Sequence, residues 1–156
     1  ENFQKELAPE LSDEGIKLFY SLIVNVIIFH DYGKINPRFQ SITMKNTLRK
    51  WPVINCLDGT KHSMLSAAIY LDYFYEKIQE SPLSKDEKNV IHVFMLSNAY
   101  VISRHHGNLS GFEAFLGEFQ QNQQLADIFS CMNQGDFAEV YYGPFCKKGW
   151  RCLQPD

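Results

Sequence analysis

A helix that ends on a histidine and an aspartate constrains this chain more than any other feature. Ser12 or Asp13 can cap a helix, and apolar residues then recur at helical spacing as far as residue 30. Positions 16, 20, 23, 27 and 30 fall on one face of that helix, and we predict that this face is buried. His30 and Asp31 would then lie at its inner end, and we predict that Gly33 ends the helix.

Two further helices are predicted downstream. From residue 60 or 61 to about residue 79, apolar residues follow His62 on one face. Ser84 and Glu87 have the spacing of a capping box, which predicts a helix from Lys85 to about His105 with Gly107 as its C-terminal cap. The predicted inner stripes are Leu65, Ile69 and Tyr73 on the second helix and Ile91, Phe94, Asn98, Val101 and His105 on the third.

The rest of the chain also favours helices. Ser110 and Glu113 repeat the capping-box spacing, and Leu125 to Met132 can form another short helix. Residues 41–60 lack periodicity and are predicted to be mostly loop. No strand pattern or internal repeat is evident, and 156 residues with 45% hydrophobic content suit one domain with a real core. We therefore predict one all-α domain across residues 1–156, a bundle of five or six main helices.

Composition narrows the class of protein. The net charge of -3 argues against a protein that coats nucleic acid by bulk electrostatics. Residues 31–61 nevertheless hold six basic and two acidic residues, which suits either a solvated loop or a local surface that faces phosphate. The longest apolar run, residues 22–29, is far shorter than the roughly 20 residues of a membrane span. With no signal peptide and four cysteines without C-x-x-C spacing, we expect a cytoplasmic protein with reduced thiols and no membrane partner.

Histidines at predicted helix ends indicate a metal site. Three packed helices would gather them with Asp31 around one point, which is more polar groups than packing alone would bury. Imidazole and carboxylate donors suit manganese, iron, nickel, cobalt or zinc better than magnesium or calcium, which prefer oxygen. His92 lies elsewhere on its helix, and we predict that it is not a ligand. The candidate ligands are His30, Asp31, His62, His105 and His106.

Three motifs resemble one known family. The sequence His-Asp-Tyr-Gly-Lys at residues 30–34, with Pro-Arg-Phe-Gln at 37–40, resembles the H-D-x-G-K-x-x-x-x-F-Q signature of the HD nuclease domain of type I CRISPR interference. Residues 61–63 with 66–68 are similar to that family's next motif, and residues 103–107 resemble its paired-histidine motif. The three motifs occur in the family's order and cover the middle half of the chain.

The resemblance implies an HD-domain fold and metal-dependent hydrolysis of single-stranded DNA. One or two divalent ions would be bound, with magnesium as an alternative to the transition metals. The implied partners are a helicase, fused or separate, and the CRISPR surveillance complex. The resemblance further implies that Asp31 bridges two metals, that His30 serves the first, and that His62, His105 and His106 serve the second. Lys34 would lie near the scissile phosphate, with Arg38 or Arg104 helping to hold it.

Two departures from the family pattern leave alternatives open. The family's first histidine lies upstream of the His-Asp pair, whereas no histidine precedes residue 30 here. None of Asp127, Asp136 and Asp156 has the local pattern of the family's last aspartate, so we expect a fragment of a longer chain. The alternatives are an HD phosphohydrolase that acts on nucleotides or cyclic nucleotides, and a catalytically impaired helical interaction domain.

Residue types alone leave simpler roles open for several of these positions. Lys34 could be a solvated turn lysine, and Phe39 and Gln40 could only pack a short helix. Trp51 could stack on a DNA base or lie in the core.

Overall fold

The described part of the chain is built from helices only. The computed structural model describes residues 11–36, 39–46, 62–108 and 111–121, and these residues contain no strand. There are four α-helices, α2 (Asp13–Phe29), α3 (Ser63–Glu80), α4 (Lys85–Arg104) and α5 (Phe112–Gln120), and two short helical segments lie between α2 and α3. The short segments are η1 (Tyr32–Ile35), a 3₁₀ turn, and η2 (Phe39–Thr43), a π turn. The predicted all-α class is confirmed for the described residues.

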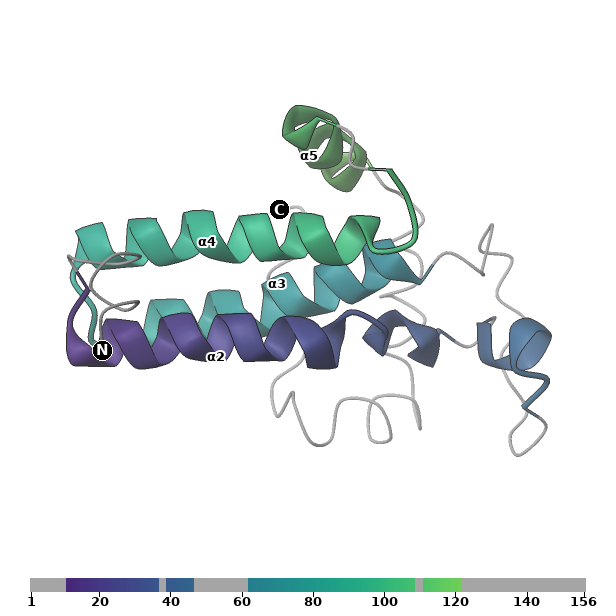
Figure 1. The fold of residues 1–156 in the computed structure, drawn as a ribbon, viewed down its shortest axis with the longest axis horizontal. Coiled ribbons are helices and arrows are strands. Elements are labelled where there is room, and N and C mark those ends of the chain that lie inside the picture. Colours follow the sequence, from purple (N-terminus) through teal and green to yellow (C-terminus); the bar gives the residue numbers. More distant parts are fainter. Residues whose placement is uncertain (1–10, 37–38, 47–61, 109–110, 122–156) are drawn as a thin grey trace.

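Helices α2 and α4 run side by side in the same direction, and α3 runs antiparallel behind them (Figure 1). Several residue pairs that contact each other across these two parallel helices are 75 positions apart in the sequence. The Ser12 backbone N–H donates to Glu87, and the rings of Phe19 and Phe94 stack at 4.1 Å between centroids. His30 and His105 continue the same register, with ring centroids 5.3 Å apart. The ends of α2 and α4 therefore lie at the same end of the bundle, where α3 begins.

Helix α3 carries the centre of the core. Its residues Leu65 to Tyr70 are buried without interruption. The Tyr70 hydroxyl donates to the Leu22 carbonyl at 3.1 Å and accepts from the Asn98 side-chain amide at 2.9 Å. One buried phenol thus joins α2, α3 and α4, and its hydrogen bonds satisfy a polar group that would be costly to bury alone.

The prediction of which face of α2 is buried is wrong. The helix buries Gly15, Leu22 and Phe29 instead, whereas Tyr20, Ile23 and Ile27 are exposed at 38%, 36% and 74%. Residues 18–29 are apolar on nearly every side of the helix, so spacing alone does not select the face that meets its neighbours. Packing against α3 and α4 makes that choice.

The helix bounds were predicted more accurately than the faces. Ser12 caps α2, and the Ser84 and Glu87 capping box opens α4 as predicted. Helix α5 has Gly111 rather than Ser110 as its N-cap, while its Phe115 is fully buried. On α4 the predicted inner residue Val101 is 52% exposed, because the core face is formed by Ile91, Met95, Ala99 and Ile102.

Several sequence predictions fall outside the described residues. These are the turn at Pro37 and Arg38, most of the predicted loop including Trp51, the short helix 125–132, the four cysteines and the three downstream aspartates. Within the described residues, no helix has both the length and the apolar character needed to cross a membrane.

The Glu87 carboxylate accepts hydrogen bonds from Ser12 at the start of α2 and from Ser84 at the start of α4. Its contribution to stability should therefore depend on pH. Hydrogen bonds from Ser12, and next from Ser84, lower the pKa of the Glu87 carboxyl from 4.5 to about 2. A carboxyl with a lowered folded-state pKa stabilises the fold above its unfolded pKa, and this contribution is lost as the pH falls through the folded value. Glu87→Gln is therefore expected to lower the free energy of unfolding at pH 7.

Urea unfolding at several pH values checks the prediction for Glu87. The difference between the wild type and Glu87→Gln should shrink as the pH falls from about 4.5 towards 2. Glu80→Gln, at the exposed end of α3, is the matched control and should change stability little. A deficit of Glu87→Gln that stays constant down to pH 2 would contradict the role of the carboxylate charge.

Candidate metal centre

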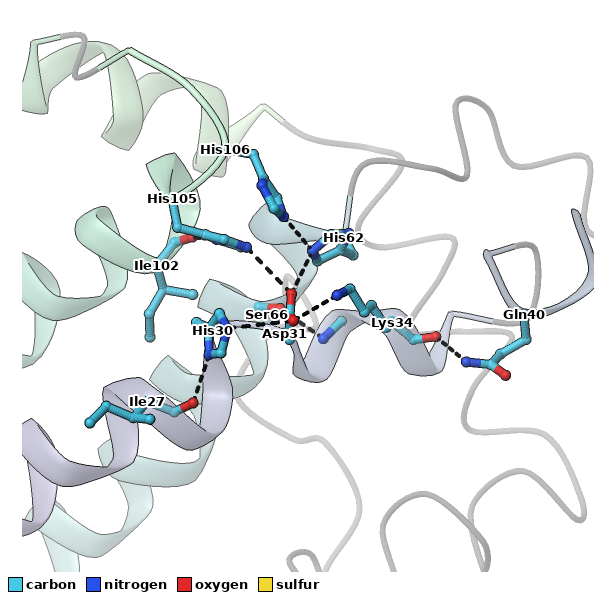
Figure 2. A network of polar contacts seen from close by, with 11 residues as sticks. Ile27, His30, Asp31, Lys34, Gln40, His62, Ser66, Ile102, His105 and His106 are labelled. Carbon is cyan, nitrogen blue, oxygen red and sulfur yellow. Dashed lines mark hydrogen bonds and ion pairs between the residues drawn. The ribbon is translucent and has the colours of Figure 1, made fainter. Parts of the chain in front are cut away.

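Three helix ends assemble a cluster of polar side chains. His30 and Asp31 directly follow α2, His62 is the N-cap of α3, and His105 and His106 directly follow α4. Because α2 and α4 are parallel and α3 is antiparallel, these ends meet at one end of the bundle, as Figure 2 shows. The arrangement of the helices thus gathers residues that are up to 76 positions apart in the chain.

Asp31 lies at the centre of the cluster, and its two carboxylate oxygens contact different side chains. Its Oδ1 lies 2.9 Å from His62 Nε2 and 3.5 Å from His105 Nε2. Its Oδ2 lies 2.6 Å from Lys34 Nζ and 3.4 Å from His30 Nε2. The hydrogen bond from Lys34 lowers the pKa of Asp31 from 3.8 to about 2, so this carboxylate is an anion near neutral pH.

Backbone carbonyls orient two of the imidazoles. His30 Nδ1 lies 2.6 Å from the Ile27 carbonyl oxygen, and His105 Nδ1 lies 2.6 Å from the Ile102 carbonyl oxygen. A carbonyl oxygen can only accept, so we assign a proton to each Nδ1, and each Nε2 is directed at Asp31. Metal-binding histidines are commonly held in this way by a hydrogen bond from the other ring nitrogen.

The contact between His105 and Asp31 leaves a place for a cation. His105 Nε2 is buried and has no hydrogen-bond partner among the described residues. With its ring proton on Nδ1, this nitrogen offers only a lone pair to Asp31 Oδ1, which is also an acceptor. Either an added proton or a metal ion can relieve the repulsion between two acceptors.

The contacts of His62 also suit a ligand of a metal ion. Burial lowers the pKa of His62, which favours the neutral ring with a single proton. Its Nε2 nevertheless lies against two groups at once, Asp31 Oδ1 at 2.9 Å and His106 Nε2 at 3.1 Å. Its Nδ1 is buried without a hydrogen-bond partner among the described residues. A close meeting of imidazole nitrogens and a carboxylate oxygen is typical of ligands that share one ion.

The spacing of these donor atoms is near that of ligands around a single ion. Asp31, His62, His105 and His106 each offer one donor atom, and the four atoms all lie within 4.8 Å of one another. Neighbouring ligands that lie about 2.1 Å from a common ion are separated by about 3.0 Å at octahedral angles and about 3.4 Å at tetrahedral angles. Three of the separations between these donor atoms are 2.9, 3.1 and 3.5 Å, and the others lie within 4.8 Å. This group could therefore hold a metal ion.

The 3₁₀ turn η1 lies directly against the first turn of α3. The Gly33 backbone N–H donates to Ser66 Oγ at 2.7 Å, and this hydrogen bond is buried. A Cβ atom on Gly33 would overlap the His62 carbonyl oxygen and lie within 2.9 Å of Ser66 N and Oγ. The prediction that Gly33 ends the first helix is wrong, since α2 already ends at Phe29. Glycine is required here because the two backbones approach so closely.

Neighbouring side chains complete the cluster and were only partly foreseen. The buried Phe39 ring meets the His62 ring edge-on at 5.2 Å, and Gln40 donates to the Lys34 carbonyl at 2.6 Å. Phe39 thus packs on the cluster and Gln40 binds the turn that carries Lys34, so neither residue only packs the short helix. Ser66 belongs to a motif found in the sequence, yet sequence reasoning gave its hydroxyl no role, because its partner is 33 positions away.

The remaining candidate residues have different outcomes. His30 contacts Asp31 Oδ2 and lies outside the four-donor group. Lys34 is not a freely solvated lysine but an ion-pair partner of Asp31. Arg104 makes two hydrogen bonds to Glu118 of α5, at 2.9 and 3.0 Å, so its guanidinium is directed at α5. Arg38 lies outside the described residues, and His92 lies beside Tyr75, apart from the cluster.

Comparisons with known protein families, with curated proteins and with solved structures find no match to this chain.

Proposed function

We propose that this chain is a metal-dependent phosphodiesterase of the HD type that hydrolyses single-stranded DNA. The observation that supports the proposal is the convergence of one carboxylate and three imidazoles at the helix ends. Three nitrogen donors favour manganese, iron, cobalt, nickel or zinc over magnesium. The resemblance of the three motifs to the HD nucleases of type I CRISPR interference supports single-stranded DNA as the substrate. It also supports a helicase and the surveillance complex as partners.

The side chains of the cluster suit phosphodiester hydrolysis. Asp31, His62, His105 and His106 would hold the ion, and a divalent ion in such a site supplies Lewis acidity and lowers the pKa of water. Lys34 adds a partly exposed positive charge 2.6 Å from Asp31 Oδ2, where it can bind a phosphate oxygen. His62 is buried whereas His106 is exposed, so a substrate would approach from the side of His106.

One observation favours a second candidate function. The described residues contain one four-donor group, while the second oxygen of Asp31 is engaged by Lys34. A centre with a single ion suits an HD phosphohydrolase that acts on nucleotides or cyclic nucleotides. The two candidates share the metal and the hydrolytic chemistry, and they differ in the size of the substrate.

An assay of the reconstituted protein distinguishes the candidates. The purified chain is loaded separately with manganese, iron(II), cobalt, nickel, zinc or magnesium, and bound metal is measured by mass spectrometry. Each form is then offered fluorescent single-stranded DNA, nucleoside phosphates and cyclic nucleotides. We expect a transition-metal form to cleave DNA, whereas hydrolysis of nucleotides alone would favour the second candidate. His62→Ala should lose bound metal, while the matched control His92→Ala should retain it.

A protein that binds no transition metal after reconstitution would contradict both hydrolytic candidates. That result would favour the helical interaction domain in which the histidines have a structural role.

A further inference from the structure

The relative position of Asp31 and His62 depends on a contact between two backbone segments. Asp31 precedes η1, whereas His62 opens α3, so the two ligands come from different parts of the chain. Asp31 Oδ1 and His62 Nε2 lie 2.9 Å apart, but both side chains can rotate about their single bonds. A precise ligand geometry needs support from the backbone behind it.

Ser66 connects the two segments. Its backbone N–H donates to the His62 carbonyl at 2.8 Å, so it lies one helical turn after His62. Its hydroxyl oxygen accepts from the backbone N–H of Gly33 at 2.7 Å, two residues after Asp31. One residue is thus hydrogen-bonded to both segments that carry the ligands.

The contact leaves little freedom to either segment. Ser66 is fully buried, and no space remains for a side chain at Gly33. Within η1, the Lys34 N–H donates to the Asp31 carbonyl at 3.0 Å, which holds Asp31 in the same turn as Gly33. A shift of Gly33 away from Ser66 would therefore also shift Asp31 away from His62.

We propose that Ser66 is a positioning residue of the metal centre, which acts by holding η1 on the first turn of α3. The inference rests on the proposed metal centre and adds to it a residue that touches neither the ion nor the substrate. Without the Ser66 hydroxyl, the buried Gly33 N–H has no acceptor, which is unfavourable. We therefore expect η1 to shift until this N–H reaches another acceptor. The separation between Asp31 Oδ1 and His62 Nε2 should grow as a result.

Metal affinity and stability together test the role of Ser66. Ser66→Ala is compared with Ser103→Ala, since Ser103 is also buried but its hydroxyl donates within α4 to the Tyr100 carbonyl. Competition with a chelator measures the affinity for cobalt(II) or zinc(II), and urea unfolding measures stability. Ser66→Ala should weaken metal affinity by about 10–100-fold, as is usual when support behind a ligand is lost. Ser103→Ala should change affinity by at most a few fold.

A second readout does not depend on bound metal. In the metal-free protein, the ring-nitrogen NMR shifts of His62 should change in Ser66→Ala, because its contact with Asp31 changes, while those of His92 should stay the same. Unchanged affinity together with unchanged His62 shifts would overturn the inference even if stability falls. Changed His62 shifts in a protein that binds no metal would uphold the positioning of His62 and contradict only the proposed function.

Discussion

Replacing Asp31 with alanine is expected to abolish metal binding and cleavage while the helices remain folded. Asp31 is the only carboxylate in the four-donor group of the described residues, so its loss leaves three imidazoles without a balancing negative charge. Losing a residue that only hydrogen-bonds to a metal ligand lowers metal affinity by about 10–100-fold. Losing the ligand Asp31 itself should therefore lower metal affinity by more than about 100-fold. Because its side chain is 36% exposed, its ion pairs should contribute no more than about 1 kcal/mol to stability.

Asp86→Ala is the matched control for Asp31→Ala. Asp86 is an exposed carboxylate in the first turn of α4, far along the helix from the cluster. Both variants should keep the helical circular dichroism spectrum, and only Asp31→Ala should lose bound metal and cleavage. Metal-dependent cleavage that survives in Asp31→Ala would contradict the central role of this carboxylate.

Gly33→Ala is expected to produce the largest change in structure. The added Cβ would overlap the His62 carbonyl oxygen and crowd Ser66 N and Oγ at 2.8 and 2.9 Å, so η1 would have to move away from α3. Overpacking of this kind costs about 1–3 kcal/mol and occasionally more. Displacing η1 would also separate Asp31 from His62, so metal affinity should fall together with the free energy of unfolding.

Gly117→Ala makes the same chemical change where there is space. A Cβ on Gly117 would meet nothing within 4 Å, and the residue lies inside α5. Alanine is favoured over glycine in a helix by about 0.5–1 kcal/mol, so this variant should be slightly more stable than the wild type. Urea unfolding of both variants checks the prediction, and equal effects at the two positions would contradict the close approach at Gly33.

Local signals in the sequence were sufficient for the helices and for much of the cluster. The capping residues Ser12, Ser84 and Glu87 set the starts of α2 and α4 through contacts within a few positions. Because His30, His62 and His105 lie at or beside helix ends, a bundle of three helices was enough to predict that they meet. The structure places them around Asp31.

Contacts between distant positions account for what the sequence did not reveal. The buried face of α2 depends on packing, since residues on nearly all its sides are apolar. The role of Gly33 depends on His62 and Ser66, which approach it only in the folded chain. Arg104 resembled a phosphate ligand in sequence, yet it binds Glu118 on another helix. None of these contacts leaves a periodic or short-range pattern.

The exposed apolar side of α2 affects how the protein should behave in solution. Tyr20, Ile23 and Ile27 present apolar surface to water, and Ile27 keeps 74% of its surface accessible. The free energy gained by covering such surface grows on warming and in the presence of sulfate, and it weakens on cooling. The solubility of this chain should therefore fall as temperature or sulfate concentration rises, and low-sulfate buffers near 4 °C should favour its dispersed form.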